Sequence, residues 1–135
     1  MPEMTARILL VEDNKTDALL LQHSLAEVTA ADVALTWVEC IGDGLAALRK
    51  NTFDIVLLDL TLADSSGPDT YARIQKTAPH LPIVVLTGSL DEAAGVEAIR
   101  RGVQDYLVKG VSGGDIVTRS IRYAIERKDH RRGEG

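Results

Sequence analysis

Five short, continuous apolar segments recur along the chain and restrict its fold more than any other feature. They are RILLV (7–11), VALTWV (33–38), DIVLL (54–58), PIVVL (82–86) and DYLV (105–108). Short unbroken apolar runs rich in β-branched residues are typical of strands that are buried on both faces. The stretches between and after them, at about 15–28, 43–51, 67–77, 91–101 and 113–129, have the composition of amphipathic helices. This alternation predicts an α/β fold, doubly wound, with parallel strands, right-handed crossovers and helices on both faces.

Local signals indicate where the helices begin and which side faces the sheet. Gly67 and Pro68 suit a helix start, because proline is favoured in the first turn. Ser112 and Asp115 have the spacing of a capping box. Apolar residues at helical spacing, which we expect to face the sheet, are Leu20, Leu21, Leu25 and Val28 in the first helix and Ala94, Ala98 and Ile99 in the fourth.

The composition is that of one folded domain. The chain has 135 residues, of which 45% are apolar and 26% charged, so it is long enough for a core and too apolar for a disordered tail. We expect one domain over 1–135, with a core at about 5–128 and a tail, or the start of a linker, at 129–135. The net charge of −5 argues against direct nucleic-acid binding.

The same composition excludes some kinds of site. Cys40 is the single cysteine, so an internal disulfide or a cysteine-based metal cluster is excluded, and simple packing is its expected role. No apolar segment approaches the ~18–20 residues that a membrane span needs, and no secretory leader is recognisable. We therefore expect a cytoplasmic protein without membrane contact.

Chemically active residues follow four of the five predicted strands. Glu12 and Asp13 follow the first, Asp59 the third, Thr87 the fourth and Lys109 the fifth. The carboxyl ends of parallel strands meet at one edge of the sheet, where such folds bind ligands. An isolated carboxylate inside a buried strand would be costly. We therefore expect Asp59 to be the first residue outside the core, at the mouth of a crevice.

Three converging carboxylates repel one another and need positive charge nearby. Lys109 supplies one charge, and a divalent cation would supply two more. Oxygen ligands that are few and open to water favour Mg²⁺ over zinc. A metal-bound carboxylate cluster with a lysine and a hydroxyl is suited to phosphoryl transfer onto a carboxylate.

These motifs together resemble the response-regulator receiver domain of two-component signalling, over residues 5–128. The matching segments are the acidic pair in LLVEDN, Asp59 in IVLLDLTLADSSG, Thr87 and Gly88 in VVLTGS, and Tyr106 with Lys109 in DYLVKG. The resemblance implies a flavodoxin-like (βα)5 sandwich with a five-stranded parallel sheet in the order 2-1-3-4-5.

The resemblance also implies a chemistry for each site residue. Asp59 would be the phosphoacceptor, receiving a phosphoryl group from a sensor histidine kinase or a phosphotransfer protein. Asp13, Asp59 and the backbone carbonyl of Thr61 would bind Mg²⁺ directly, and Glu12 largely through water. The chain would be a signalling switch that catalyses only its own phosphorylation and dephosphorylation.

The remaining implied roles concern the switch. Lys109 would pair with Asp59 and then with the phosphoryl oxygens, while Thr87 would hydrogen-bond the phosphoryl group. Tyr106 would then turn from solvent towards the space beneath the fourth helix. The surface of the fourth helix, fifth strand and fifth helix would control a partner, an attached output domain or a homodimer.

Three other readings, and two departures from the family pattern, bear on these expectations. A hydrolase of the haloacid-dehalogenase type would also use a strand-end aspartate, but it needs a second acid where this chain has Thr61. A flavodoxin-like cofactor binder has the same layout, but three acids in the crevice would repel a flavin phosphate. The third alternative, which these residues do not exclude, is a receiver-shaped interaction module that is never phosphorylated. Gly110 and Ala63 stand where many receivers have proline, so no cis peptide at 109–110 is inferred.

Overall fold

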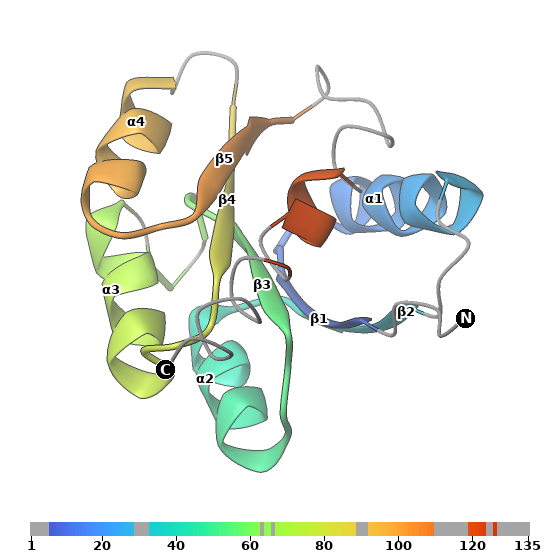
Figure 1. Ribbon diagram of the computed structural model, residues 1–135, viewed down its shortest axis with the longest axis horizontal. Helices are drawn as coiled ribbons and strands as arrows, with labels where there is room; N and C mark the ends of the chain where they lie inside the picture. The colour runs from blue at the N-terminus through green and yellow to red at the C-terminus, as the bar shows by residue number, and fades with distance from the viewer. Residues whose placement is uncertain are drawn as a thin grey trace.

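The computed structural model describes residues 6–28, 33–62, 64–65, 67–88, 92–109, 119–123 and 126. Within them, five parallel strands form one sheet in the order β2-β1-β3-β4-β5 (Figure 1). The strands are β1 (Ala6–Val11), β2 (Val33–Val38), β3 (Ile55–Asp59), β4 (Ile83–Thr87) and β5 (Asp105–Val108). The predicted fold class and strand order are confirmed, and each observed strand lies within one residue of its predicted position.

Four helices connect these strands. They are α1 (Lys15–Val28), α2 (Ile41–Lys50), α3 (Pro68–Thr77) and α4 (Glu92–Arg100). Helix α3 begins at Pro68 as predicted, after Gly67, whose φ of 68° favours a residue without a side chain. Residues 119–123 and 126 are helical, whereas the rest of the predicted fifth helix and the capping box at Ser112 lie outside the described residues.

The core has two layers because helices cover both faces of the sheet (Figure 1). On the α1 side, Ala18, Leu25 and Ile121 pack with the alternate strand residues Ile8, Leu10, Ile55, Leu57 and Val84. On the opposite side, Ile41, Tyr71, Ile74 and Ala98 pack with Leu9, Val11, Val56, Leu58 and Val85. Strands β3 and β4 are buried throughout, which confirms that their unbroken apolar runs lie between two helical layers.

The predicted inner faces of two helices need correction. In α1, Leu21 and Leu25 pack on the core as predicted, but Leu20 is 61% exposed and Ala18 takes its place on the inner face, where it is fully buried. In α4, Ala98 is buried as predicted, but Ile99 is 42% exposed and Gly95 faces inward. Small residues mark these inner faces because the helices lie close to the sheet, and apolarity alone did not reveal them. No helix among the described residues is long and apolar enough to span a membrane.

Candidate functional site

Three carboxylates converge at the carboxyl ends of β1 and β3. One oxygen each from Glu12, Asp13 and Asp59 lies within 4.8 Å of the other two. Strands β1 and β3 are parallel neighbours, with Val11 paired to Leu58, so the residues that follow these two positions come together. The predicted convergence of the three acids is therefore confirmed as geometry.

Asp59 lies one residue deeper than predicted. It is the last residue of β3, paired with Leu86 of β4, and only 5% exposed. The expectation that it is the first residue outside the core is wrong by that one position. Its burial is tolerated because both carboxylate oxygens have donors: the Thr61 N–H donates to Oδ1 at 3.0 Å, and Lys109 Nζ donates to Oδ2 at 3.1 Å.

Lys109 supplies the positive charge of the site. It follows β5 directly, and its backbone N–H donates to the Thr87 carbonyl at 2.8 Å, which fixes the start of its side chain. Its ammonium lies 2.7 Å from Glu12 Oε1 and 3.1 Å from Asp59 Oδ2. The predicted position of the ammonium beside the acids is confirmed.

The charges within this cluster alter one another's protonation. Burial, with further contributions from the neighbouring Asp59, raises the pKa of Glu12 to about 7, although the Lys109 ammonium and the Asn14 N–H favour the ionised form. Burial acts to lower the pKa of Lys109, but hydrogen bonds and charges from Glu12 and Asp59 raise it above its ordinary value. The cluster thus keeps Lys109 charged and has an excess of carboxylate that favours a further cation.

Thr87 and Tyr106 lie close to the cluster in the sheet but point elsewhere. The Thr87 hydroxyl is buried and donates to the Leu107 carbonyl at 3.5 Å, a weak bond at the limit of hydrogen-bonding distance. The Tyr106 side chain is half-buried, and its ring lies against α4 at Gly95. Their proposed switching roles are compatible with these positions and stay predictions.

A further carboxylate, Asp17, was missed by the sequence analysis. Its Oδ2 lies 3.2 Å from Lys109 Nζ, although the two residues are 92 positions apart. An acidic residue in the first turn of a helix is usually explained by the helix dipole, so its position in the chain did not indicate a place in the site.

Two residues outside the acidic cluster hold its surroundings in place. The Trp37 indole Nε1 of β2 donates to the Glu12 carbonyl at 2.7 Å. The Asp64 carboxylate accepts hydrogen bonds from the backbone N–H groups of Ile41 and Gly42 at 3.0 and 3.2 Å, which ties the connection after Asp59 to the start of α2.

Cys40 has a role beyond the packing expected of it. Its Sγ accepts a hydrogen bond from the Asp43 N–H and so caps the start of α2.

The donor set fits a hard divalent cation. Three carboxylates offer oxygen ligands, and Asp13 is exposed, so water would reach the ion. Mg²⁺ suits such a site because it keeps several of its waters. Thr61 lies beside the acids through its N–H bond to Asp59, which is compatible with its predicted carbonyl ligand.

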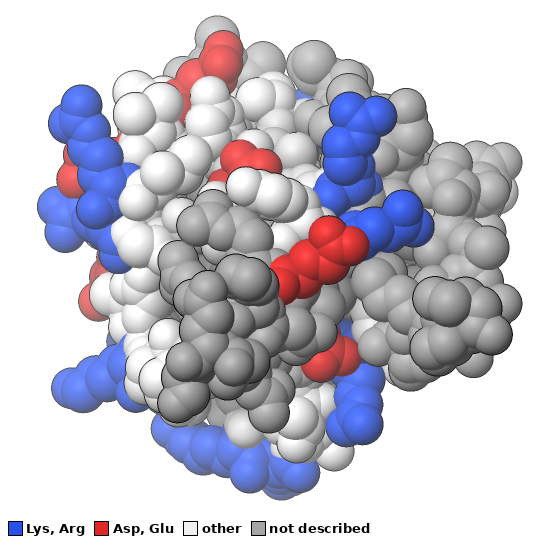
Figure 2. Space-filling view, in the orientation of Figure 1, with Lys and Arg blue, Asp and Glu red and all other residues white. Residues whose placement is uncertain are grey.

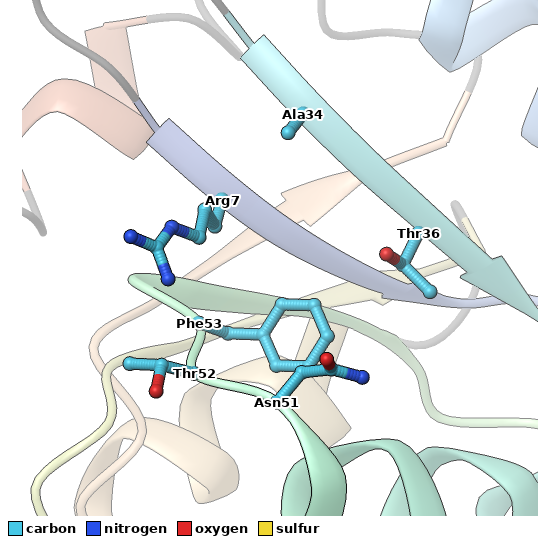
Figure 3. Close-up of a pocket in the computed structure, with 6 residues that line it drawn as sticks. All are labelled: Arg7, Ala34, Thr36, Asn51, Thr52 and Phe53. Carbon is cyan, nitrogen blue, oxygen red and sulfur yellow. The ribbon is translucent and has the colours of Figure 1, made fainter.

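A separate pocket lies near the amino ends of β1 and β3, away from the acids. Figure 3 shows Arg7 and Thr36 from the sheet beside Asn51, Thr52 and Phe53. These residues line a pocket with a volume of about 160 Å³. The pocket is a shallow surface feature, because four of its lining residues are exposed: Arg7, Thr36, Asn51 and Thr52.

The charged side chains that the structure describes on the face seen in Figure 2 form no single patch. Basic side chains are scattered around the rim of this face and are interrupted by acidic and neutral ones.

Comparisons with known proteins identify related chains. The family model described as response regulator receiver domain matches residues 8–120. Regulatory protein LuxO of Vibrio cholerae is 34% identical over 125 residues, which cover 89% of this chain and 26% of LuxO. Response regulator protein FleR of Pseudomonas aeruginosa is 32% identical over 131 residues, covering 90% and 25% of the two chains. The chain thus spans about a quarter of the length of these relatives.

Solved structures agree with the sequence relatives. A response regulator receiver domain protein from Clostridium thermocellum superposes with a TM-score of 0.78 at 28% identity, covering 92% of this chain and 97% of that one. NtrX from Brucella abortus superposes with a TM-score of 0.85 at 26% identity, covering 96% of this chain and 29% of NtrX.

Proposed function

The chain belongs to the response regulator receiver domain family, and from that premise we propose that it is a switch controlled by phosphorylation of Asp59. Receiver domains are signalling switches that are phosphorylated on an aspartate and bind Mg²⁺ at an acidic pocket. The observation that carries the assignment to this chain is the meeting of Glu12, Asp13 and Asp59 around the ammonium of Lys109. We propose one domain over 1–135, with a core at about 5–128.

Asp59 supplies the nucleophile in the proposed reaction. A carboxylate oxygen of Asp59 attacks the phosphorus of a phosphohistidine on a partner protein, forming an O–P bond while the P–N bond breaks. The histidine nitrogen keeps the electron pair and takes up a proton, and Asp59 becomes an acyl phosphate. Hydrolysis of this acyl phosphate by water returns the carboxylate and inorganic phosphate.

The acids that flank Asp59 hold the cation in this proposal. Asp13, Asp59 and the Thr61 carbonyl would ligate Mg²⁺ directly, with Glu12 acting through water. The ion, when bound, neutralises charge that develops on the phosphoryl oxygens. Glu12 also keeps the Lys109 ammonium in place through its 2.7 Å contact, so this residue serves both cations.

Phosphorylation of Asp59 alters the surface of the domain through three residues, Lys109, Thr87 and Tyr106. The new phosphoryl oxygens offer acceptors to the Lys109 ammonium and to the Thr87 hydroxyl, whose present bond to Leu107 is long. A charge-assisted hydrogen bond is worth roughly 1.5–3 kcal/mol, so a few of them shift a two-state equilibrium substantially. Tyr106 then follows Thr87 beneath α4.

The partners follow from this chemistry. A sensor histidine kinase or a phosphotransfer protein donates the phosphoryl group in the cytoplasm. The surface of α4, β5 and the helix that contains residues 119–123 acts on an output domain, a separate partner or a second copy of the chain. On the face seen in Figure 2, the basic side chains of the described residues are scattered and form no continuous patch, which fits the proposal that the chain does not bind nucleic acid directly.

Phosphorylation by a small acyl phosphate tests the assignment. We expect the chain, incubated with acetyl phosphate and Mg²⁺, to gain the mass of one phosphoryl group, and Asp59→Asn to gain none. Asp54→Asn is the matched control, because Asp54 precedes the opposite end of the same strand, where it accepts the Arg7 N–H. Intact-mass spectrometry measures the gain.

Three outcomes would contradict the proposal. They are an unmodified wild-type chain, a phosphoryl group that persists in Asp59→Asn, and continuous turnover of phosphate esters. The last would favour a hydrolase instead.

A further inference from the structure

The Lys109 ammonium has a third carboxylate partner whose role the family assignment leaves open. Its contacts are Glu12 Oε1 at 2.7 Å, Asp59 Oδ2 at 3.1 Å and Asp17 Oδ2 at 3.2 Å. An ammonium group has three N–H donors, so these three acceptors match its full capacity. A new acceptor in the site must therefore displace one of them or share its hydrogen.

Asp17 is directed to Lys109 by the way in which α1 begins. Asn14 caps this helix, because its side-chain oxygen accepts the Asp17 N–H at 2.9 Å and its carbonyl accepts the Ala18 N–H. An acid at the third helical position commonly reaches back to the N–H of the cap residue. Here Glu12 Oε2 already accepts the Asn14 N–H at 3.1 Å. The Asp17 carboxylate is consequently available for the ammonium.

The three partners differ in how readily they can be released. The side chains of Glu12 and Asp59 are only 1% and 7% exposed, so losing the ammonium would leave a buried carboxylate without its counterion. The Asp17 side chain is 39% exposed, and water can replace its partner. The Asp17 contact is therefore the one that costs least to break.

We propose that Asp17 is a positioning residue that holds the third N–H of Lys109 in the unmodified protein and competes with the phosphoryl group for it. This inference rests on the proposed function of Asp59 and adds a residue that opposes its phosphorylation. Glu12 and Asp59 already fix the ammonium, so removing the Asp17 charge leaves Lys109 in place. The ammonium then meets the phosphoryl oxygens without that competitor.

Binding of a phosphoryl mimic measures the competition. Beryllium trifluoride is titrated at saturating Mg²⁺ against the wild type, Asp17→Asn and Asp17→Glu, and backbone amide signals are followed by NMR. Asp43→Asn is the matched control, because Asp43 is also exposed and occupies the same third position in α2. Among the described residues, the carboxylates paired with Lys109 are those of 12, 17 and 59, so this control leaves the ammonium untouched.

We expect Asp17→Asn to bind the mimic about two- to five-fold more tightly than the wild type at low salt, as suits a partly exposed ion pair. The gain should shrink as salt screens the charges, and Asp17→Glu and Asp43→Asn should match the wild type. Equal or weaker binding by Asp17→Asn, or an equal gain in Asp43→Asn, would overturn the proposal.

A second readout separates this inference from the proposed function. In the protein without mimic, the ¹H–¹⁵N signal of the Lys109 ammonium should shift in Asp17→Asn and stay unchanged in Asp43→Asn. If the wild type binds no mimic, the proposed function fails while this signal still reports on the ion pair. If the mimic binds and the Lys109 signal is the same in both variants, the role of Asp17 alone is refuted.

Discussion

At the scale of single residues, the site is organised by the Lys109 ammonium, which lies within 3.2 Å of carboxylate oxygens of Glu12, Asp17 and Asp59. Glu12, Asp13, Asp59 and Lys109 were predictable because each lies at or just after the carboxyl end of a strand, and the parallel arrangement brings these ends to one edge of the sheet. The contact between Asp17 and Lys109 was not predictable, because it depends on where α1 begins and on Glu12 accepting the hydrogen bond from the Asn14 N–H. Side-chain contacts that depend on competition between neighbours leave no mark in residue spacing.

Trp37 makes the site visible to fluorescence. It is the sole tryptophan of the chain, and its indole donates to the Glu12 carbonyl at 2.7 Å. We expect Mg²⁺ to change its emission with a saturable dependence, because a cation held by the adjacent carboxylates alters the polarity around that bond. Asp13→Asn should weaken the apparent Mg²⁺ affinity by roughly tenfold or more, as expected when an ion loses a carboxylate.

Sodium chloride at matched ionic strength is the control for this titration. An emission change that is equal with sodium, or is unaffected by Asp13→Asn, would place the response outside the acidic cluster.

At the scale of whole elements, the apolar pattern predicted the strands that are uniformly buried, but it did not predict the inner face of a helix that packs closely on the sheet. The runs in β3 and β4 predicted these strands well because both faces are covered. The inner side of α4 was mispredicted because it uses Gly95, which has no apolar side chain to reveal it. The ring of Tyr106 occupies the space that a side chain at Gly95 would fill. Close approach of a helix to a strand is thus set by a missing side chain.

Gly95→Ala tests the contact between α4 and β5. A Cβ at this position would lie 2.5 Å from the Tyr106 ring, which is far closer than carbon atoms pack. We expect the substitution to force the ring away from α4 and to lower the free energy of unfolding by about 1–3 kcal/mol, measured by urea denaturation.

The double variant Gly95→Ala, Tyr106→Ala supplies the reference. Without the ring, alanine should stabilise the helix relative to glycine by up to about 1 kcal/mol. A cost of Gly95→Ala that is the same in both backgrounds would show that the ring is not its cause.

At the scale of the whole molecule, stability towards acid depends on links between separate elements. Asp64 is one such link, because it accepts two backbone N–H groups at the start of α2 from the connection that follows β3. The hydrogen bond from Ile41, the larger cause, together with that from Gly42, lowers the pKa of Asp64 below its ordinary value. Such a group stabilises the fold above its unfolded pKa, and this contribution is lost as the pH falls through its folded pKa.

Thermal unfolding as a function of pH tests this link. We expect Asp64→Ala to destabilise the chain near neutral pH by about 1 kcal/mol, a typical cost of losing a side-chain cap. The difference between the variant and the wild type should shrink as the pH is lowered below the ordinary range of an aspartate. A difference that is constant with pH, or grows on acidification, would contradict the role of the ionised carboxylate.

The sheet order also decides when during synthesis the chain could become competent. Asp59 ends β3, while its counterion follows β5, which pairs with β4 at the far edge. A nascent chain emerging from the ribosome therefore displays its acids before the ammonium that balances them. Until the last strand docks, those acids lack Lys109, so a partly made or truncated molecule leaves its buried carboxylates without their counterion.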